Sequence, residues 1–127
     1  MKRLLTMIMG VLLFAPLGVK AAEIGDIVNA LKQADPAEIT KFFDSFVDIK
    51  LPNKDEVKNV SKNQASITLK DFYTEQGING FELSSKREMG GTGYLVGKLK
   101  TDSRTFNVTI MVKTKGSTTT ILSVRIN

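Results

Sequence analysis

The segment RTFNVTIMVKTKGSTTTILSVRIN, residues 104–127, carries the pattern that decides the fold. Apolar residues occupy every second position from Phe106 to Val112 and again from Leu122 to Ile126. This period of two is typical of β-strands with one buried face. The polar letters TKGS around Gly116 separate the two runs and predict a tight turn. We therefore expect an antiparallel strand pair whose apolar face covers a core.

Two more strand-like segments precede this pair. They are FELSSKREM, residues 81–89, and TGYLVGKL, residues 92–99. Gly90 and Gly91 separate the first from the second, and the turn TDSR connects the second to the closing pair. Four consecutive strands joined by short turns predict an antiparallel meander.

Upstream of the meander, three segments have the spacing of amphipathic helices. In EIGDIVNALKQAD, residues 23–35, apolar residues recur at helical intervals from Ile24 to Leu31. In DPAEITKFFDSF, residues 35–46, Asp35 is placed to cap a helix whose apolar side we expect at Ile39, Phe42 and Phe43. The third segment is SKNQASITLKDFYTEQG, residues 61–77, with a serine placed to cap its start and a glycine to end it.

Between the second and third helices, FVDIKLP, residues 46–52, alternates like a half-buried strand. The following NKDEVKN, residues 53–59, is expected to be a polar loop. The order is then helix, helix, strand, helix and four strands. The sequence predicts a single α+β domain over residues 22–127, with the helices packed on an antiparallel sheet.

The first 21 residues differ from the rest of the chain. Lys2 and Arg3 precede an apolar run from Leu4 to Leu17, and small residues end at Ala21. This layout is typical of a secretory signal peptide, with cleavage expected after Ala21 or the alanine that follows. We expect a periplasmic or extracellular protein without a permanent membrane span after cleavage. An uncleaved anchor is the alternative.

Charge argues against a nucleic-acid partner. Cleavage would remove three of the 18 basic residues and keep all 13 acidic ones, which leaves a net charge of about +2. Lys98, Lys100 and Arg104 gather beside a turn, but the remaining charges are scattered. A solvated strand edge explains this cluster better than a nucleic-acid patch.

Alternation divides the closing strands into two faces. The face expected to be buried takes Leu95, Gly97, Leu99, Phe106, Val108, Ile110, Val112, Leu122, Val124 and Ile126. The opposite face has four apolar residues, Tyr94, Val96, Met111 and Ile121. If these four lie together, they form a patch through which a homodimer could assemble. An ordinary exposed sheet surface is the alternative.

The ordered set of segments resembles a family of small exported bacterial proteins, domain of unknown function 4783. The segments that carry the resemblance are DPAEITKFFD running into VDIKLP, then SKNQASITLKDFY, GFELSSKREMGGTGYLVGKLKT, TFNVTIMVK and ILSVRIN. That family belongs to the superfamily resembling nuclear transport factor 2, whose folds overlap in shape with cystatin-like folds. The resemblance implies a strongly bent antiparallel sheet around helices, with a conical cavity at one mouth. It implies no activity.

Several chemistries are excluded by composition. The chain has no histidine and no cysteine, so it lacks the commonest acid/base group, the commonest transition-metal ligand and any thiolate nucleophile. The glycines of EMGGTGYLVG precede a strand rather than a helix, so they do not form a phosphate-binding loop. We expect no cofactor and no metal.

Three functions remain open, and one of them is a purely structural role in the cell envelope. The first is a non-catalytic domain that binds a small apolar ligand in the cone, where Phe72 and Tyr73 are candidate contacts, or a protein partner on the sheet face. The alternative is a cone-pocket enzyme of the isomerase or dehydratase type that the superfamily includes. Such pockets need an Asp or Tyr against an apolar wall, for which the candidates are Asp44, Asp71, Tyr73 and Tyr94. No residue is assigned a catalytic role.

Overall fold

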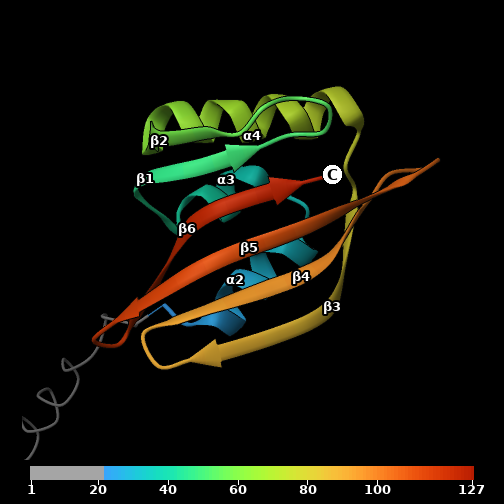
Figure 1. The fold of residues 1–127 in the computed structure, drawn as a ribbon. Coiled ribbons are helices and arrows are strands. Elements are labelled where there is room, and N and C mark those ends of the chain that lie inside the picture. The colour runs from blue at the N-terminus through green and yellow to red at the C-terminus, as the bar shows by residue number, and fades with distance from the viewer. Residues whose placement is uncertain (1–21) are drawn as a thin grey trace, which may run out of the picture.

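The computed structural model describes residues 22–127, so the predicted signal segment and the cleavage site at Ala21 lie outside the described residues. The elements in chain order are α2 (Ile24–Lys32), α3 (Pro36–Thr40), β1 (Phe43–Lys50), β2 (Val57–Ser61), α4 (Lys62–Gln76), β3 (Gly80–Met89), β4 (Thr92–Lys100), β5 (Thr105–Lys115) and β6 (Thr118–Ile126). The six strands form one sheet in the order β2-β1-β6-β5-β4-β3. Helices α2 and α3 lie behind this sheet in Figure 1, and α4 runs beside the β1–β2 hairpin. Within the described residues, no helix is long and apolar enough to cross a membrane.

The predicted α+β class and the β3–β6 meander are confirmed, because each consecutive pair from β3 to β6 is antiparallel. The sheet as a whole is mixed rather than purely antiparallel. Strand β1 pairs with β6 in the parallel direction, with Ile49 opposite Val124. The β1–β2 hairpin is thereby joined to the meander in a single sheet.

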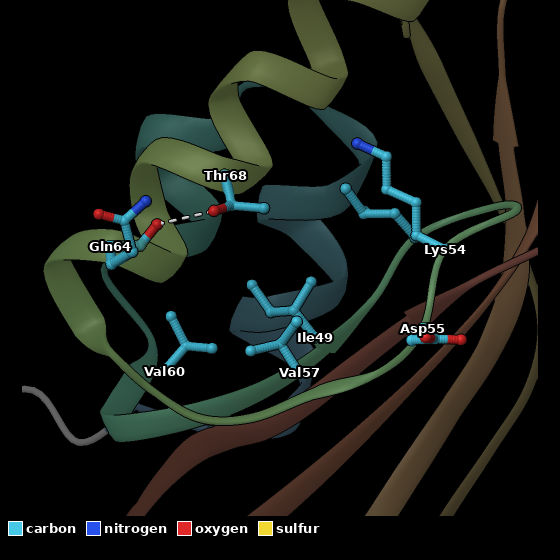
Figure 2. Close-up of a pocket in the computed structure, with 8 residues that line it drawn as sticks. Ile49, Lys54, Asp55, Val57, Val60, Gln64 and Thr68 are labelled. Carbon is cyan, nitrogen blue, oxygen red and sulfur yellow. Dashed lines mark hydrogen bonds between the residues drawn. The ribbon is translucent and has the colours of Figure 1, made fainter.

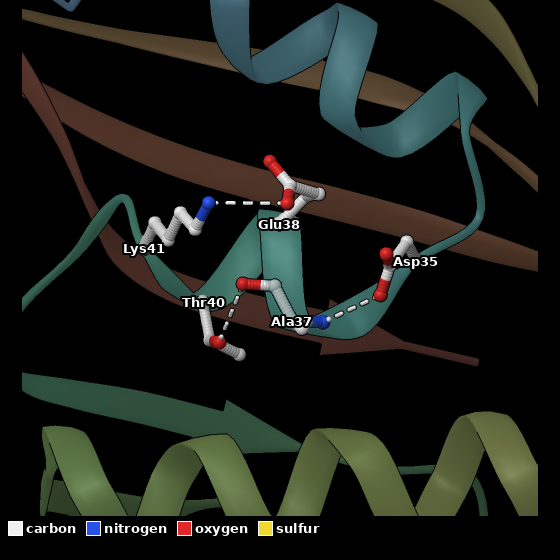
Figure 3. A network of polar contacts seen from close by, with 5 residues as sticks. All are labelled: Asp35, Ala37, Glu38, Thr40 and Lys41. Atoms are coloured by element: carbon white, nitrogen blue, oxygen red, sulfur yellow. Dashed lines mark hydrogen bonds and ion pairs between the residues drawn. The ribbon is translucent and has the colours of Figure 1, made fainter.

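Helix α3 is shorter than the sequence predicts. It begins where the Asp35 carboxylate accepts a hydrogen bond from the Ala37 N–H at 3.0 Å (Figure 3). Lys41, the residue after the helix, forms a 3.1 Å ion pair with Glu38 inside it. The helix ends at Thr40, and Phe43 already belongs to β1. The expected helical role of Phe43 is therefore wrong, although its side chain is buried. Spacing alone could not separate a helix end from a strand that starts three residues later.

Strand β2 is absent from the sequence prediction, which assigned residues 53–59 to a loop. It pairs antiparallel with β1 through an irregular register between Val47 and Ile49. Asn59 adopts a left-handed conformation with φ of 55°, and its N–H donates to the Asp48 carboxylate at 2.8 Å. Asparagine tolerates this conformation better than most residues, so a bulge forms and interrupts the alternation that would have revealed the strand.

Helix α4 has the ends that the sequence predicts. The Ser61 side chain accepts from the Gln64 N–H at 3.3 Å. Gly77, with φ of 68°, donates its N–H to the Tyr73 carbonyl at 3.0 Å. The inward side of this helix contributes Ala65, Leu69 and other side chains to the core.

The core lies between the sheet and the helices. The strands contribute Val47, Ile49, Leu95, Leu99, Phe106, Val108, Ile110, Val112, Ile121, Val124 and Ile126. Two residues of β6 lie on the opposite side of the sheet from the one predicted. Ile121 is fully buried at 0% exposure, and Leu122 is only half-buried. The cause is a bulge, since Met111 pairs with Ser123 while its neighbour Val112 pairs with Ile121. Leu122 is the extra residue, and the prediction that Ile121 belongs to the outer face is wrong.

Candidate functional site: two adjoining cavities

A cavity of about 320 Å³ lies between the β1–β2 hairpin and α4. We call it the hairpin cavity. Its lining comes from the end of β1, the hairpin loop, β2 and the first half of α4: Ile49, Leu51, Lys54, Asp55, Val57, Val60, Gln64 and Thr68. This volume is at the lower end of the range that holds small organic ligands.

The floor of the hairpin cavity is apolar. Figure 2 shows Ile49, Val57 and Val60 in the space between the hairpin strands and α4. Ile49 belongs to the core, whereas Val57 keeps 57% of its surface exposed. An exposed branched side chain beside two more buried ones offers apolar surface that a ligand could remove from water.

Polar groups stand around this floor. Thr68 projects from α4 and donates its hydroxyl to the Gln64 carbonyl at 3.0 Å (Figure 2). Its oxygen can still accept a hydrogen bond from a ligand. Lys54 and Asp55 lie at the loop end, and neither forms an ion pair with another residue of the described range 22–127. An apolar floor with a few polar groups is typical of a small-molecule site.

A second cavity of about 130 Å³ adjoins the first. We call it the loop cavity. Its lining is Leu51, Pro52, Asn53, Lys54, Phe72, Glu75, Gln76, Arg104 and Phe106. Leu51 and Lys54 therefore line both cavities.

The wall of the loop cavity contains two aromatic rings and a guanidinium group in mutual contact. The rings of Phe72 and Phe106 meet edge to face, with centroids 5.3 Å apart. The Arg104 guanidinium carbon lies 4.4 Å from the Phe106 ring centroid. Of the two predicted ligand contacts, Phe72 lines this cavity. Tyr73 lines neither cavity and is buried, and that burial raises the pKa of its phenol.

The predicted enzyme candidates do not come together. Asp44 lies on β1 and forms a 3.1 Å ion pair with Lys113 on β5. The pKa of Asp44 is lowered, first by the hydrogen bond from the Ser45 N–H and then by Lys113. A lowered pKa keeps the carboxylate ionised and suits an ion pair rather than a proton donor.

The other two candidates are also not lining residues of either cavity. Asp71 is exposed on α4, and Tyr94 lies half-buried on β4 opposite Met111 of β5. Neither residue lines the hairpin cavity or the loop cavity. No set of three or more Asp and Glu side chains within residues 22–127 is arranged to hold a metal ion.

Three of the four predicted interface residues share a neighbourhood on the sheet. Tyr94 and Met111 are cross-strand partners, and Val96 follows two residues along the same strand. Met111 is 36% exposed, while Tyr94 and Val96 are half-buried. Ile121 is in the core and cannot contribute to this patch.

A further hollow of about 370 Å³ lies where α2 begins beside the turn between β5 and β6. Its lining is polar apart from Ile24, which is itself buried. It offers a ligand little apolar surface. The hairpin and loop cavities therefore form the stronger candidate site.

Residue patterns in the sequence identify Phe72 but not the residues of β2 that form the hairpin cavity. Val57 and Val60 are three apart, with Lys58 and Asn59 between them, so they do not show the period of two. The available signal was the branched residues themselves, which are enriched in strands.

The fold is shared with solved structures. A protein of the same unknown-function family from Bacteroides uniformis ATCC 8492 superimposes with a TM-score of 0.74 at 21% identity, covering 82% of this chain and 94% of that one. One from Bacteroides ovatus ATCC 8483 has a TM-score of 0.72 at 19% identity, covering 84% and 96% respectively. At such identities these structures show the fold alone.

A more distant neighbour has a similar fold. An NTF2-like protein of unknown function from Cytophaga hutchinsonii ATCC 33406 has a TM-score of 0.58 at 9% identity, with 87% of this chain and 93% of that one covered. The comparison with curated proteins found no match. The family described as Domain of unknown function (DUF4783) matches residues 24–127, which include every helix and strand described above. The chain belongs to this family, and its fold is of the NTF2-like kind.

Proposed function

We propose that this protein is an exported, non-catalytic binding domain whose hairpin cavity takes a small ligand with an apolar chain. The observation that carries the proposal is the exposed apolar floor of that cavity, with Val57 the most exposed of its branched side chains. A ligand that covers such surface is bound more tightly, because each Å² of apolar surface removed from water contributes roughly 25 cal/mol of free energy.

The size of the cavity narrows the ligand. A volume of about 320 Å³ has room for one short aliphatic chain. The polar groups of Lys54, Asp55 and Gln64 stand at its edge rather than across its floor. Lys54 and Asp55, at the loop end, would orient the polar end of the ligand and leave its chain against Ile49, Val57 and Val60.

Binding can be tested with decanol as the probe. Methyl signals of Ile49, Val57 and Val60 in heteronuclear NMR spectra should shift and saturate as decanol is added, because their side chains form the floor. Thr68→Trp would fill the cavity from α4 and should abolish those shifts. Ile67→Trp is the matched control, since Ile67 is the exposed neighbour of Thr68 and does not line the cavity.

Three results would contradict the proposal. The first is an absence of saturable shifts in the unmodified protein. The second is shifts centred on residues away from the hairpin cavity. The third is equal binding by the Thr68→Trp variant when circular dichroism shows that it is folded.

Export is supported by the charged start and apolar run that end at Ala21. Expression in a bacterial host, followed by fractionation and intact-mass measurement, tests it. We expect the protein outside the cytoplasmic membrane with a mass that starts at residue 22 or 23. A full-length mass in the membrane fraction would favour the uncleaved anchor.

A second copy of the chain is the partner that we propose for the outer sheet face. The favourable observation is that Tyr94, Val96 and Met111 adjoin one another there. Sedimentation velocity at micromolar concentration should show a dimer that Met111→Lys dissociates. A monomer that the substitution does not affect would argue strongly against this arrangement.

The enzymatic alternative lacks such support. Asp44, Asp71, Tyr73 and Tyr94 line neither the hairpin cavity nor the loop cavity. Substituting Asp44 with Asn should therefore leave ligand binding at the hairpin cavity unchanged.

A further inference from the structure

Arg104 is held ready for an anion at the wall of the loop cavity. Its guanidinium stacks over the Phe106 ring at 4.4 Å, and Phe106 is fixed in turn by its edge-to-face contact with Phe72. Stacking on a ring restrains the guanidinium plane and leaves its N–H donors at the edge free to point outward. The side chain therefore loses less entropy when it binds a ligand than a freely moving lysine would.

The turn before β5 fixes the backbone of the same residue. The Thr101 N–H donates to the Arg104 carbonyl at 2.9 Å, and the Thr101 hydroxyl oxygen accepts from the Arg104 N–H at 3.0 Å. Asp102 in this turn accepts a 2.8 Å hydrogen bond from the Asn79 side chain. Arg104 therefore extends from a braced turn rather than from a loose loop.

The charge of Arg104 is not neutralised within the described part of the chain. None of the ion pairs formed by residues 22–127 includes Arg104 or Lys54. Glu75 also lines the loop cavity, so the charged side chains of this cavity are two cations and one carboxylate. A balance of one positive charge is complementary to a single anionic group.

The two cavities adjoin across Leu51 and Lys54, which line both. One cavity offers an apolar floor, and the other offers a stacked guanidinium. A molecule with an aliphatic chain and a charged head would satisfy both at once, whereas an uncharged chain would use only the first.

We propose that the loop cavity is an anion subsite of the hairpin cavity, and that the ligand is a single-chain amphiphile with a carboxylate or phosphate head bound by Arg104. This inference rests on the proposed function, because the chain is placed in the hairpin cavity. Carboxylate and phosphate share the geometry that an arginine binds through two parallel hydrogen bonds. Lys54 would add a point charge on the same head from the shared wall.

Dissociation constants for decanoate, decanol and decyl phosphate at neutral pH test the subsite. The two anions are kept below their critical micelle concentrations and decanol below its solubility limit. We expect decanoate to bind about ten-fold more tightly than decanol, since one charge-assisted pair contributes at least this ratio. Arg104→Gln should remove the preference and leave the affinity for decanol unchanged. Arg104→Lys should keep only part of the preference, because it keeps the charge without the planar fork. Decyl phosphate distinguishes a phosphate head from a carboxylate head.

Lys98→Gln is the matched control, since Lys98 carries the same charge on an exposed part of β4 and lines neither cavity. It should keep the preference for decanoate. Equal affinities for decanoate and decanol in the unmodified protein would overturn the anion subsite alone. If Lys98→Gln and Arg104→Gln lose the preference for decanoate to the same extent, the anion subsite is also overturned. The preference would then come from the net charge of the protein. Failure of all three probes to bind would contradict the proposed function as well.

Discussion

At the scale of single residues, Gly97 shows how closely β3 and β4 approach each other. A Cβ atom at this position would lie 2.5 Å from the Glu82 carbonyl oxygen and 2.6 Å from the Phe81 ring. Real Cβ atoms do not reach such distances, and a backbone carbonyl in a paired strand cannot move aside cheaply. The aromatic ring of Phe81 thus covers the surface that a side chain at residue 97 would otherwise occupy.

Gly97→Ala is expected to lower the free energy of unfolding by about 2 kcal/mol, because strand β3 would have to shift. Urea denaturation followed by circular dichroism measures the change. Gly25→Ala is the control: a Cβ there meets nothing within 4 Å, and Gly25 lies in helix α2. That variant should gain up to about 1 kcal/mol from helix propensity. A neutral Gly97→Ala would contradict the close contact.

The Asp44 carboxylate makes the stability of the fold depend on pH. Its pKa in the folded state is lowered by the Ser45 N–H and, to a smaller extent, by Lys113. The carboxylate therefore stabilises the fold fully above the unfolded-state pKa of roughly 4, and this contribution disappears as the pH falls through the folded-state pKa. Since the side chain is 29% exposed, solvent screening keeps the contribution below about 1 kcal/mol.

Asp44→Asn should accordingly be less stable than the unmodified protein at pH 7 and indistinguishable from it near pH 2, to within about 0.3 kcal/mol. Lys113→Gln should lose less stability at pH 7 than Asp44→Asn does, because the hydrogen bond from the Ser45 N–H lowers the Asp44 pKa more than Lys113 does. Urea unfolding at both pH values measures these differences. If Asp44→Asn is still less stable than the unmodified protein near pH 2, the ionised Asp44 carboxylate is not the source of the difference in stability.

At the scale of elements, the bulge in β6 determines which side chains reach the core. Ile121 pairs with Val112 and is fully buried, and the extra residue Leu122 then restores the register so that Ser123 pairs with Met111. Val124 and Ile126 remain inside as the alternation predicts. The inserted residue Leu122 thus reverses the predicted inward and outward directions for the residues before it in β6. The residues after it keep their predicted directions.

Ile121→Ala should cost about 3 kcal/mol in unfolding free energy, because it leaves a void in a packed core. Leu122→Ala should cost about 1 kcal/mol, because its side chain is already half in solvent. Parallel thermal and urea denaturation of both variants provides the comparison. The reverse order of costs would show that β6 has the regular alternation instead.

Elements that are defined by local signals could be predicted from the sequence, and those that depend on distant partners could not. Ser61 and Gly77 mark both ends of α4 because each acts within its own turn. β2 was missed because Asn59 takes a left-handed conformation in which its N–H donates to the Asp48 carboxylate, eleven residues away. The hairpin cavity was missed with it, whereas Phe72 was found because helical spacing places it on the inner side of α4.

At the scale of the whole molecule, the β1–β2 hairpin is tied to the rest by β6. The Ile121 N–H donates to the Phe42 carbonyl at 2.7 Å, and Arg125 forms a 3.0 Å ion pair with Glu56 beside β2. No local pattern predicts the parallel pairing of β1 with β6, because the two strands are separated by most of the domain. The strands that line the hairpin cavity consequently belong to the same sheet as the meander.

This continuity predicts one cooperative unfolding transition. The fluorescence of Tyr73 in α4 and Tyr94 in β4, together with far-ultraviolet circular dichroism of the strands, should give coincident urea curves for residues 22–127. Single-tyrosine variants, Tyr73→Phe and Tyr94→Phe, separate the two fluorescence probes. A Tyr94 transition that follows or precedes that of Tyr73 would show that the hairpin with α4 unfolds as an independent unit.

The central position of β6 also bears on when the molecule can assemble. This strand lies between β1 and β5, yet every other strand precedes it in the chain. During synthesis the two earlier groups, β1–β2 and β3–β5, have no common edge until β6 leaves the ribosome, and bringing together partners so distant in sequence is slow. A polypeptide whose sheet closes so late would remain unfolded long enough to pass a translocation channel, which the proposed export would need.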